Sequence, residues 1–206
     1  MPDPVGTVLL AAGRGTRFGA SPKLLSPLDG KPLVRHAAEA AVAADLGPVV
    51  AVLGHAGEAV RDALTGLKLT LVENPDYADG LSTSLRAGLD ALPGEIAAAL
   101  ILLGDMPRIG PGLLVRLAEG FRTAPVAPSA VVPVRDGQRG NPVLLNRRLL
   151  APGLAALDGD RGAGPLLARR DDVLELPVDE AGVLIDVDTP AALAGLDRPI
   201  RSAAAR

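Results

Sequence analysis

Short apolar runs alternate with amphipathic segments along most of the chain. Each run is bounded by Gly, Pro, Asn or Asp, as is typical of buried strands, and the segments between the runs carry apolar residues at helical spacing. The pattern predicts strands over residues 5–12, 49–53, 67–72, 97–103, 130–134, 142–145, 173–176 and 184–187. It predicts helices over residues 33–44, 58–64, 82–92, 111–121, 148–157, 164–170 and 190–196.

Strands that alternate with helices favour an α/β fold with a mostly parallel sheet. Helices then cover both faces of the sheet, which gives three layers in a Rossmann-like arrangement. The 206 residues fit one domain, expected over residues 1–198, followed by a tail over residues 199–206. Residues 135–140 read as a hairpin-like turn within the second half.

Composition excludes several classes of function. The chain has no Cys and two His residues, so thiol chemistry, iron–sulfur clusters and multi-histidine metal sites are not expected. A net charge of -3 and three aromatic residues give no basic, stacking surface, so we expect no nucleic-acid partner. The longest apolar run, Ile96–Leu103, is too short for a bilayer, and no secretory leader is recognised. We expect a soluble, cytoplasmic protein without a membrane partner.

The first stretch that carries chemistry follows the first predicted strand. It reads Leu10-Ala11-Ala12-Gly13-Arg14-Gly15-Thr16-Arg17-Phe18-Gly19, with Lys23 four residues on. Ligands of open α/β sheets bind at such strand ends, glycines let backbone N–H groups approach phosphate oxygens, and Arg17 and Lys23 add cations. The stretch indicates polyphosphate binding, with plain turn chemistry as the alternative. Phe18 breaks the dinucleotide pattern G-x-G-x-x-G, and no P-loop is present.

Two acidic positions indicate a Mg²⁺ site. Asp105, in Gly104-Asp105-Met106-Pro107, directly follows the most apolar strand. In Asp186-Val187-Asp188-Thr189-Pro190, strand alternation places Asp186 and Asp188 on one side, so that Asp188 can complete a two-carboxylate site with Asp105. The alternatives are local: Asp105 caps the next turn, and Asp188 or Thr189 caps the final helix.

A third stretch, from Asn74 to Gly88, carries three hydroxyls at a predicted helix start. Such a start offers hydrogen-bonding groups and the positive end of the helix dipole to a nucleotide. Simple capping by Ser82 is the alternative. We expect the nucleotide-binding residues of this stretch to be Asn74, Gly80, Ser82 and Ser84.

These stretches together resemble the nucleotidyltransferases with a MobA-like fold. The shared motifs are Leu-Ala-Ala-Gly-x-Gly-x-Arg-x-Gly-x-x-x-Lys, Asp29-Gly30-Lys31-Pro32-Leu33, Asn-Pro-x-x-x-x-Gly-x-x-x-Ser-Leu, Gly-Asp-Met-Pro and Asp-x-Asp-Thr-Pro. The resemblance covers about residues 5–196, and stretches 137–144 and 159–163 make the chain most similar to molybdenum cofactor cytidylyltransferases. It departs from many relatives at Tyr77, Asn141 and Gly164.

The resemblance implies a GT-A-type nucleotidyltransferase fold, with a nucleotide-binding half over residues 1–107 and an acceptor-binding half over residues 108–198. It implies catalysis by Arg17, Lys23 and Asp105, with Mg²⁺ on Asp105 and Asp188. The nucleotide would contact Leu10, Ala11, Ala12, Gly13, Arg14, Gly15, Thr16, Arg17 and Lys23 besides the four residues of the third stretch. The acceptor would contact Arg139, Gly140, Asn141 and Asp186.

The implied reaction is transfer of CMP from CTP to the terminal phosphate of a molybdopterin-type cofactor, with release of pyrophosphate. A molybdoenzyme or an insertion chaperone is an implied protein partner. One alternative is a guanylyltransferase or a sugar- or polyol-phosphate nucleotidyltransferase of the same fold. Another is a non-catalytic nucleotide- or cofactor-binding accessory protein, and an oxidoreductase is the least favoured because the dinucleotide pattern fails. Ala12 bears on the base: guanylyl-transferring relatives tend to carry Gly there, and a methyl group takes space that a purine needs.

Overall fold

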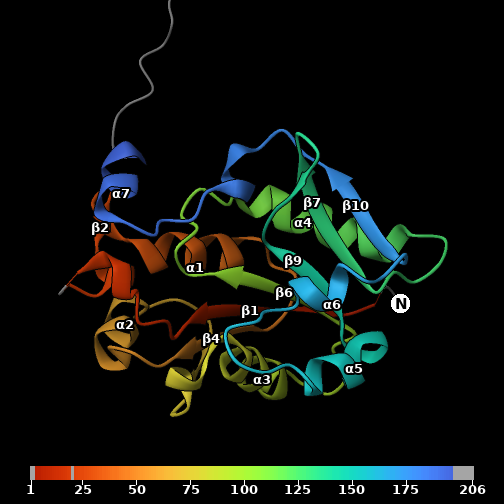
Figure 1. Cartoon of the computed structure of the whole chain (residues 1–206), viewed down its shortest axis with the longest axis horizontal. Helices are drawn as coiled ribbons and strands as arrows, with labels where there is room; N and C mark the ends of the chain where they lie inside the picture. Colours follow the sequence, from red (N-terminus) through yellow and green to blue (C-terminus); the bar gives the residue numbers. More distant parts are fainter. Residues whose placement is uncertain (1–2, 20, 197–206) are drawn as a thin grey trace, which may run out of the picture.

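A central sheet confirms the predicted α/β architecture. The computed structural model describes residues 3–19 and 21–196. Its sheet strands are β1 (Val5–Ala11), β4 (Val49–Leu53), β5 (Thr70–Glu73), β6 (Ala98–Leu103), β7 (Ala130–Arg135), β8 (Gln138–Arg139), β9 (Val143–Asn146) and β10 (Val173–Pro177). They follow the order β10–β7–β9–β6–β1–β4–β5, with β8 paired to β7 (Figure 1). Along that order β9 alone runs antiparallel to its neighbours, so the sheet is mostly parallel, as expected.

Helices cover both faces of the sheet, which confirms the three layers. The helices are α1 (Leu33–Ala43), α2 (Gly57–Ala63), α3 (Leu81–Ala91), α4 (Pro111–Thr123), α5 (Arg147–Ala155), α6 (Gly164–Leu167) and α7 (Pro190–Leu196). In Figure 1, α1 and α4 lie above the sheet and α3 and α5 lie below it. No helix within residues 3–19 and 21–196 is long and apolar enough to cross a membrane.

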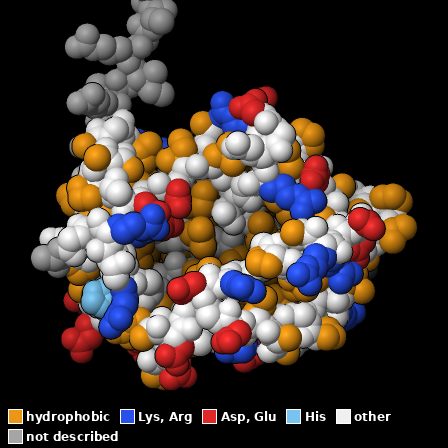
Figure 2. All heavy atoms as spheres, in the orientation of Figure 1, with side chains coloured by type: hydrophobic (Ala, Val, Ile, Leu, Met, Phe, Trp, Pro, Cys, Tyr) orange, Lys and Arg blue, Asp and Glu red, His pale blue; other side chains and the backbone are white. Residues whose placement is uncertain are grey.

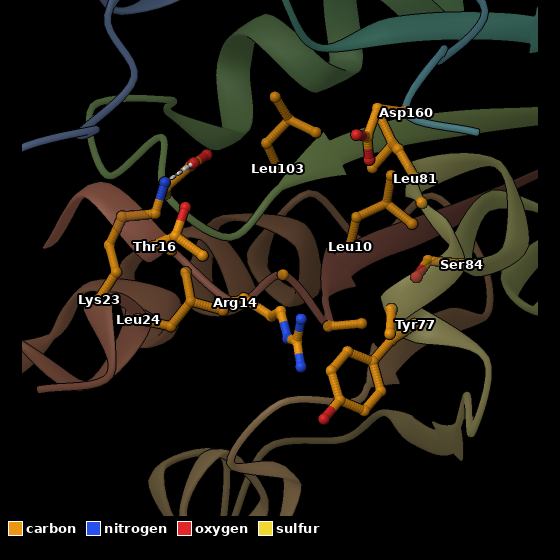
Figure 3. A pocket seen from close by; sticks show the side chains of 16 residues that line it. Leu10, Arg14, Thr16, Lys23, Leu24, Tyr77, Leu81, Ser84, Leu103 and Asp160 are labelled. Atoms are coloured by element: carbon orange, nitrogen blue, oxygen red, sulfur yellow. Dashed lines mark hydrogen bonds and ion pairs between the residues drawn. The ribbon is translucent and has the colours of Figure 1, made fainter. Parts of the chain in front are cut away.

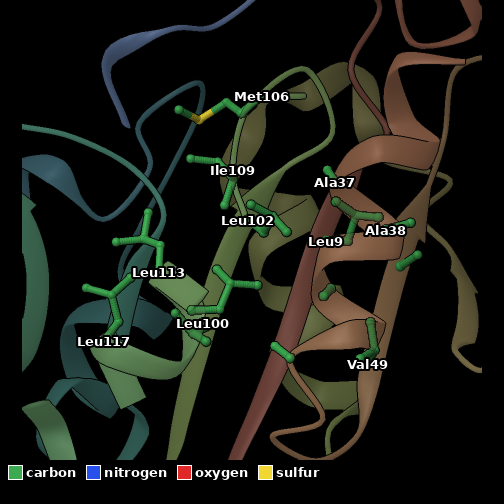
Figure 4. Close-up of a cluster of buried hydrophobic side chains, with 14 of the residues drawn as sticks. Leu9, Ala37, Ala38, Val49, Leu100, Leu102, Met106, Ile109, Leu113 and Leu117 are labelled. Atoms are coloured by element: carbon green, nitrogen blue, oxygen red, sulfur yellow. The ribbon is translucent and has the colours of Figure 1, made fainter. Parts of the chain in front are cut away.

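Alternation along β1 divides the core into two clusters. Leu9 points into the cluster formed with α1, α2 and α4, and Figure 4 shows it beside Leu100 and Leu102 of β6. Val8 and Leu10 point into the opposite cluster, formed with α3 and α5. Every residue of β1 is buried, because both faces of the strand are covered. This double burial explains why the strand reads as a continuous apolar run.

The sheet brings distant loops to one edge. β1 pairs in parallel with β4 on one side and with β6 on the other, so the order in which successive strands are added to the sheet reverses at β1. The carboxyl ends of β1 and β6 lie in register, with Leu10 opposite Leu103 and the Gly104 amide donating to the Leu10 carbonyl at 3.0 Å. A strand edge at such a reversal is where open α/β sheets bind ligands.

Two small strands form a separate hairpin beside this edge. β2 (Pro27–Leu28) and β3 (Lys31–Pro32) pair antiparallel and lead directly into α1. The turn predicted over residues 135–140 is the hairpin between β7 and β8. Asp136 and Gly137 adopt φ values of 50° and 77°, which matches the twist of a tight hairpin turn.

The prediction of a strand over residues 184–187 is wrong. Ala181–Leu184 forms a short 3-10 helix, and the chain then crosses the carboxyl edge of the sheet without joining it. The reason is a close backbone contact, because Asn141 donates to the Val183 carbonyl at 2.9 Å and a side chain at Gly140 would collide with that carbonyl. Two further predictions shift: the strand at 67–72 becomes β5, and the helix at 164–170 ends at Leu167. The tail predicted over residues 199–206 lies outside the described residues.

Gly88 lets α3 approach the sheet closely, and this contact makes a testable prediction. A Cβ at Gly88 would lie 2.3 Å from Val8 Cγ1 and 2.9 Å from Val52 Cγ2. Overpacking of about 1–3 kcal/mol then exceeds the roughly 1 kcal/mol that Ala gains over Gly inside a helix. We expect Gly88→Ala to lower the free energy of unfolding in urea, by up to about 2 kcal/mol.

Gly120 of α4 is the matched control. Its added Cβ would meet Leu174 Cδ2 at 3.5 Å, which is ordinary van der Waals contact. Gly120→Ala should therefore raise the free energy of unfolding by up to about 1 kcal/mol through helix propensity alone. Equal effects of the two substitutions would contradict the packing of α3 described above.

Candidate functional site

The loop after β1 folds back toward β6. Gly15 has φ 58° and ψ 40°, and a Cβ there would lie 2.8 Å from Lys23 Cβ. A residue with a side chain would therefore be both strained and in collision. The Phe18 amide donates to the Gly15 carbonyl at 2.8 Å, and the Phe18 ring is buried in a cluster with Leu28 and Val187. This anchored turn carries Lys23 toward the end of β6.

Lys23 joins two carboxylates that are far apart in the sequence. Its ammonium nitrogen lies 2.6 Å from Asp105 Oδ2 and 3.1 Å from Asp188 Oδ1. Arg17 reaches Asp188 Oδ2 at 2.7 Å from the exposed side of the same cluster. The side chains of Lys23 and Asp105 are 11% and 19% exposed, so this ion pair is largely shielded from water. The structure thus brings together all the residues predicted for catalysis and for the metal.

Backbone contacts hold Asp188 in this position. The Val187 amide donates to the Asp105 carbonyl at 3.0 Å, and the Val187 side chain is fully buried. Thr189 caps α7, with its Oγ1 accepting from the Ala192 amide at 3.1 Å. Of the two readings of this segment, capping therefore belongs to Thr189, and the Asp188 carboxylate faces Lys23.

Electrostatics keep Lys23 charged. Burial by itself lowers the pKa of the Lys23 ammonium, but the charges and hydrogen bonds of Asp105 and Asp188 outweigh burial and raise that pKa above its ordinary value. The ammonium is therefore a full cation at neutral pH, aimed at the two carboxylates.

The same carboxylates fit a divalent metal ion. Asp105 Oδ1 is buried without a hydrogen-bond partner among the described residues, as expected of an oxygen whose lone pair is available to a metal ion. No group of three His, Cys, Asp or Glu side chains able to hold a metal is found within residues 3–19 and 21–196. Mg²⁺ is commonly held by one or two carboxylates together with substrate phosphates and water, which matches Asp105 and Asp188.

A cavity of about 450 Å³ extends from Lys23 and Asp105 across the ends of β1 and β6. Figure 2 shows this face hollowed, with hydrophobic side chains inside the hollow. The predicted site residues that line the cavity are Leu10, Ala12, Gly13, Arg14, Gly15, Thr16, Lys23, Gly80, Ser84 and Asp105. Figure 3 shows Lys23 with its ion pair at one end and Tyr77 at the other.

Four predicted nucleotide contacts lie elsewhere. Ala11 points into the core, and Ser82 is fully buried, with its amide donating to the Gly159 carbonyl at 3.1 Å. Ser82 does not cap α3 by its side chain either, because Gly80 occupies the N-cap. Asn74 is buried and donates to Ser84 Oγ at 2.9 Å, so it orients a cavity residue. Arg17 lines a smaller depression, of about 180 Å³, with Thr16 and Asp188.

A second cavity, of about 310 Å³, adjoins the first and shares Leu10, Leu81 and Leu103 with it. Arg139, Gly140 and Asn141 line it, as predicted for the acceptor side. Arg139 Nε also donates to Glu175 Oε1 at 2.7 Å, which balances its charge. Asp186 is exposed and lines neither cavity, because the segment that carries it is not the expected strand.

Some cavity residues escaped the sequence analysis. Tyr77, Leu81, Leu103 and Asp160 line the first cavity but were not predicted as contacts there. Asp160 reaches the wall because Gly80 packs directly on the backbone of Gly159, where a Cβ would collide. In the sequence, residues 159–163 stand out only by their resemblance to molybdenum cofactor cytidylyltransferases, and Tyr77 only as a departure from relatives. A lone aromatic residue within a predicted ligand loop was the available signal for Tyr77.

Comparison with known proteins finds a matching family model and similar proteins. A model of the MobA-like NTP transferase domain matches residues 7–173. The chain is 31% identical over 188 residues to nicotine blue oxidoreductase of Paenarthrobacter nicotinovorans, covering 88% of this chain and 91% of that protein. It is 40% identical over 118 residues to the bifunctional protein GlmU of Kineococcus radiotolerans, which is 56% of this chain but only 24% of GlmU. The chain thus spans about a quarter of the length of that relative.

Solved structures share the whole fold. Rv0371c from Mycobacterium tuberculosis H37Rv superposes with a TM-score of 0.83 at 28% identity, covering 96% of this chain and 99% of that one. The structure of Rv0371C in complex with manganese matches with a TM-score of 0.77 at 30% identity, covering 94% and 97%. A structurally similar protein thus binds manganese.

Competition between Lys23 and a metal for the two carboxylates gives the next prediction. Lys23→Met removes a buried cation and leaves Asp105 and Asp188 facing each other. Unit charges near a protein surface interact by several kcal/mol at about 4 Å, so relief of this competition should be large. We expect Mn²⁺ to bind nucleotide-free Lys23→Met at least about tenfold more tightly than wild type, as measured by calorimetry.

Lys68→Met is the control, since it makes the same charge change on an exposed turn outside the cavities. It should leave Mn²⁺ affinity unchanged within about twofold, because Lys68 makes no ion pair with either carboxylate and its exposed charge is screened by salt. Equal Mn²⁺ affinities for wild type and Lys23→Met would show that Lys23 does not occupy the metal position.

Proposed function

Because the chain belongs to the MobA-like NTP transferase family, we propose that this nucleotidyltransferase transfers CMP from CTP to the terminal phosphate of a molybdopterin-type cofactor. The observation that carries the proposal is the continuity of two cavities. One contains the Lys23–Asp105 pair and the glycine loop, and the other contains Asn141 and Arg139. Leu10, Leu81 and Leu103 belong to both walls, so a nucleotide in the first cavity would lie against an acceptor in the second.

The chemistry is an in-line displacement at phosphorus. An oxygen of the acceptor phosphate forms a bond to the α-phosphorus of CTP, and the bond from that phosphorus to the bridging oxygen of pyrophosphate breaks. The electron pair leaves with pyrophosphate. The attacking oxygen is already anionic, so no general base is required, and catalysis consists of positioning and charge neutralisation.

The residues of the first cavity supply that neutralisation. Lys23, Arg17 and the amides of residues 13–16 would bind the phosphate oxygens whose charge grows as pyrophosphate departs. Asp105 and Asp188 would hold Mg²⁺, which offsets phosphate charge when bound. Lys23 now contacts both carboxylates, so it would exchange at least one of these contacts for a phosphate oxygen.

The second cavity favours a planar heterocyclic acceptor over a sugar. Eight of its lining side chains are Leu, Ile or Val: Leu10, Leu81, Leu85, Ile101, Leu103, Val132, Val143 and Leu167. Its polar side chains are Arg139 and Asn141, and Arg139 is already paired with Glu175. A sugar or polyol would leave many hydroxyls without partners there, which is costly, whereas a planar heterocycle presents apolar faces. This supports the pterin acceptor over a sugar phosphate.

Oxidoreductase activity is the second candidate function, and the name of the Paenarthrobacter relative suggests it. That protein is named nicotine blue oxidoreductase and aligns over nearly its whole length. Phe18, which replaces the last glycine of the dinucleotide pattern, is buried beneath the loop, so the residues that would hold a dinucleotide differ from that pattern. Oxidation of NADH or NADPH in the presence of a quinonoid dye tests this candidate. Turnover that does not need an NTP would favour it over nucleotidyl transfer.

Pyrophosphate release tests the leading proposal. The protein is incubated with Mg²⁺, one NTP at a time and a molybdopterin-type cofactor, and pyrophosphate and the nucleotidylated product are quantified. We expect release only with the acceptor present, and Asp105→Asn should slow it by on the order of 10²–10⁴-fold because a charged ligand of the metal is lost. Release with a sugar phosphate would instead support the related transferases. NTP binding without any release would support an accessory protein.

The side chain of Ala12 leads to a prediction about which nucleotide base the site prefers. Its side chain lines the cavity at the end of β1, beside Tyr77 and Gly54. A methyl group there leaves room for a pyrimidine and crowds a purine, and one methyl is worth about 10–200-fold in discrimination. We expect kcat/KM for CTP to exceed that for GTP by this factor, and Ala12→Gly to shrink the ratio. Equal or better use of GTP by wild type would overturn the assignment of CTP.

A further inference from the structure

Tyr77 stands at the end of the nucleotide cavity opposite Lys23 (Figure 3). It begins a 3-10 helix, Tyr77–Asp79, between β5 and α3. A Cβ at Gly54 would lie 2.7 Å from Tyr77 Cβ and Cγ, so the root of the side chain packs tightly on the loop after β4. The backbone thus fixes where the ring projects, and the ring forms the only aromatic part of the cavity wall among the described residues.

A cation covers this ring. The guanidinium carbon of Arg14 lies 5.9 Å from the Tyr77 ring centroid, within the range of a cation–π contact. Arg14 belongs to the exposed glycine loop and makes no ion pair among residues 3–19 and 21–196. The His55 ring lies 6.3 Å from Tyr77 at an interplanar angle of 49°. Tyr77 is therefore flanked by planar, polarisable groups, and the one that lines the cavity, the exposed Arg14 side chain, is held by no ion pair among the described residues.

We propose that Tyr77 is the base-stacking residue of this site, with Arg14 covering its ring until the base binds. This inference rests on the proposed function, because it places a nucleotide in the first cavity. The Lys23–Asp105 end fixes the phosphates, so the base of the same nucleotide must lie toward the opposite end, where Ala12 and Tyr77 form the wall. Aromatic stacking holds any base by its face, while Ala12 limits its size.

Arg14 can bind the phosphates once the base displaces it from the Tyr77 ring. It stands in the loop of residues 13–16, whose amides would surround the phosphates. An arginine on such a loop can exchange an aromatic face for phosphate oxygens, to which it binds more strongly. The ring and the cation therefore couple the two ends of the cavity: base stacking on Tyr77 releases Arg14 toward the phosphates.

The composition of the chain makes this inference directly measurable. Tyr77 is the only Tyr and the chain has no Trp, so intrinsic fluorescence reports on this one ring. We expect CTP to change the Tyr77 emission, with a midpoint equal to the Kd obtained by calorimetry. CTP that binds by calorimetry without altering the emission would overturn the inference and leave nucleotide binding standing. A wild-type protein that fails to bind any NTP would overturn both.

Two substitutions separate stacking from packing. Tyr77→Leu should weaken CTP binding by roughly 5–150-fold, the range measured for loss of one aromatic–base stack. Tripolyphosphate, which has no base, should bind this variant at least as tightly as it binds wild type, because the ring that holds Arg14 is gone. Tyr77→Phe keeps the ring and should restore most of the CTP affinity. If Tyr77→Leu weakens CTP and tripolyphosphate equally, or if Tyr77→Phe binds CTP as poorly as Tyr77→Leu, the ring serves packing only and the inference fails.

Discussion

The ion cluster around Lys23 is the interaction on which the site depends. It ties the loop after β1 to the end of β6 and to the segment before α7, although 82 residues separate Lys23 from Asp105 and 165 separate it from Asp188. Charges that are largely withdrawn from water need partners, since leaving one unpaired is strongly destabilising. Lys23, Asp105 and Asp188 therefore hold one another in place beside the cavity.

The backbone of the fold fixes the positions of the residues in this cluster. Parallel pairing of β1 with β6 fixes the position of Asp105, and the Val187 amide fixes Asp188 through the backbone of Asp105. The missing side chain at Gly15 allows Lys23 to reach both. The backbone therefore sets where Asp105 and Asp188 stand, and the ion pairs with Lys23 hold their side chains together. A metal ion that replaces Lys23 would meet the same two carboxylates.

Sequence patterns predicted the sheet and the general location of the site, because both follow from local rules. Buried parallel strands read as apolar runs, and the ends of β1 and β6 carry the glycine loop and Asp105. Tertiary contacts decided what the patterns could not. Asp186 was misplaced because strand alternation was assumed where the backbone instead packs against Gly140. Ser82 read as a cap or a ligand, yet the loop at Gly159 buries it. Lys23 was assigned to phosphates, and nothing in the sequence shows that it pairs with two carboxylates.

The central claim is that one cavity holds a nucleoside triphosphate between the Lys23 cluster and Tyr77. A crystal structure of the protein with a non-hydrolysable CTP analogue and Mg²⁺ tests this most directly. The account predicts phosphates along residues 13–16, metal density between Asp105 and Asp188, Lys23 moved from at least one carboxylate to a phosphate oxygen, and the cytosine ring against Tyr77. A triphosphate bound elsewhere, with Lys23 still on both carboxylates, would contradict it.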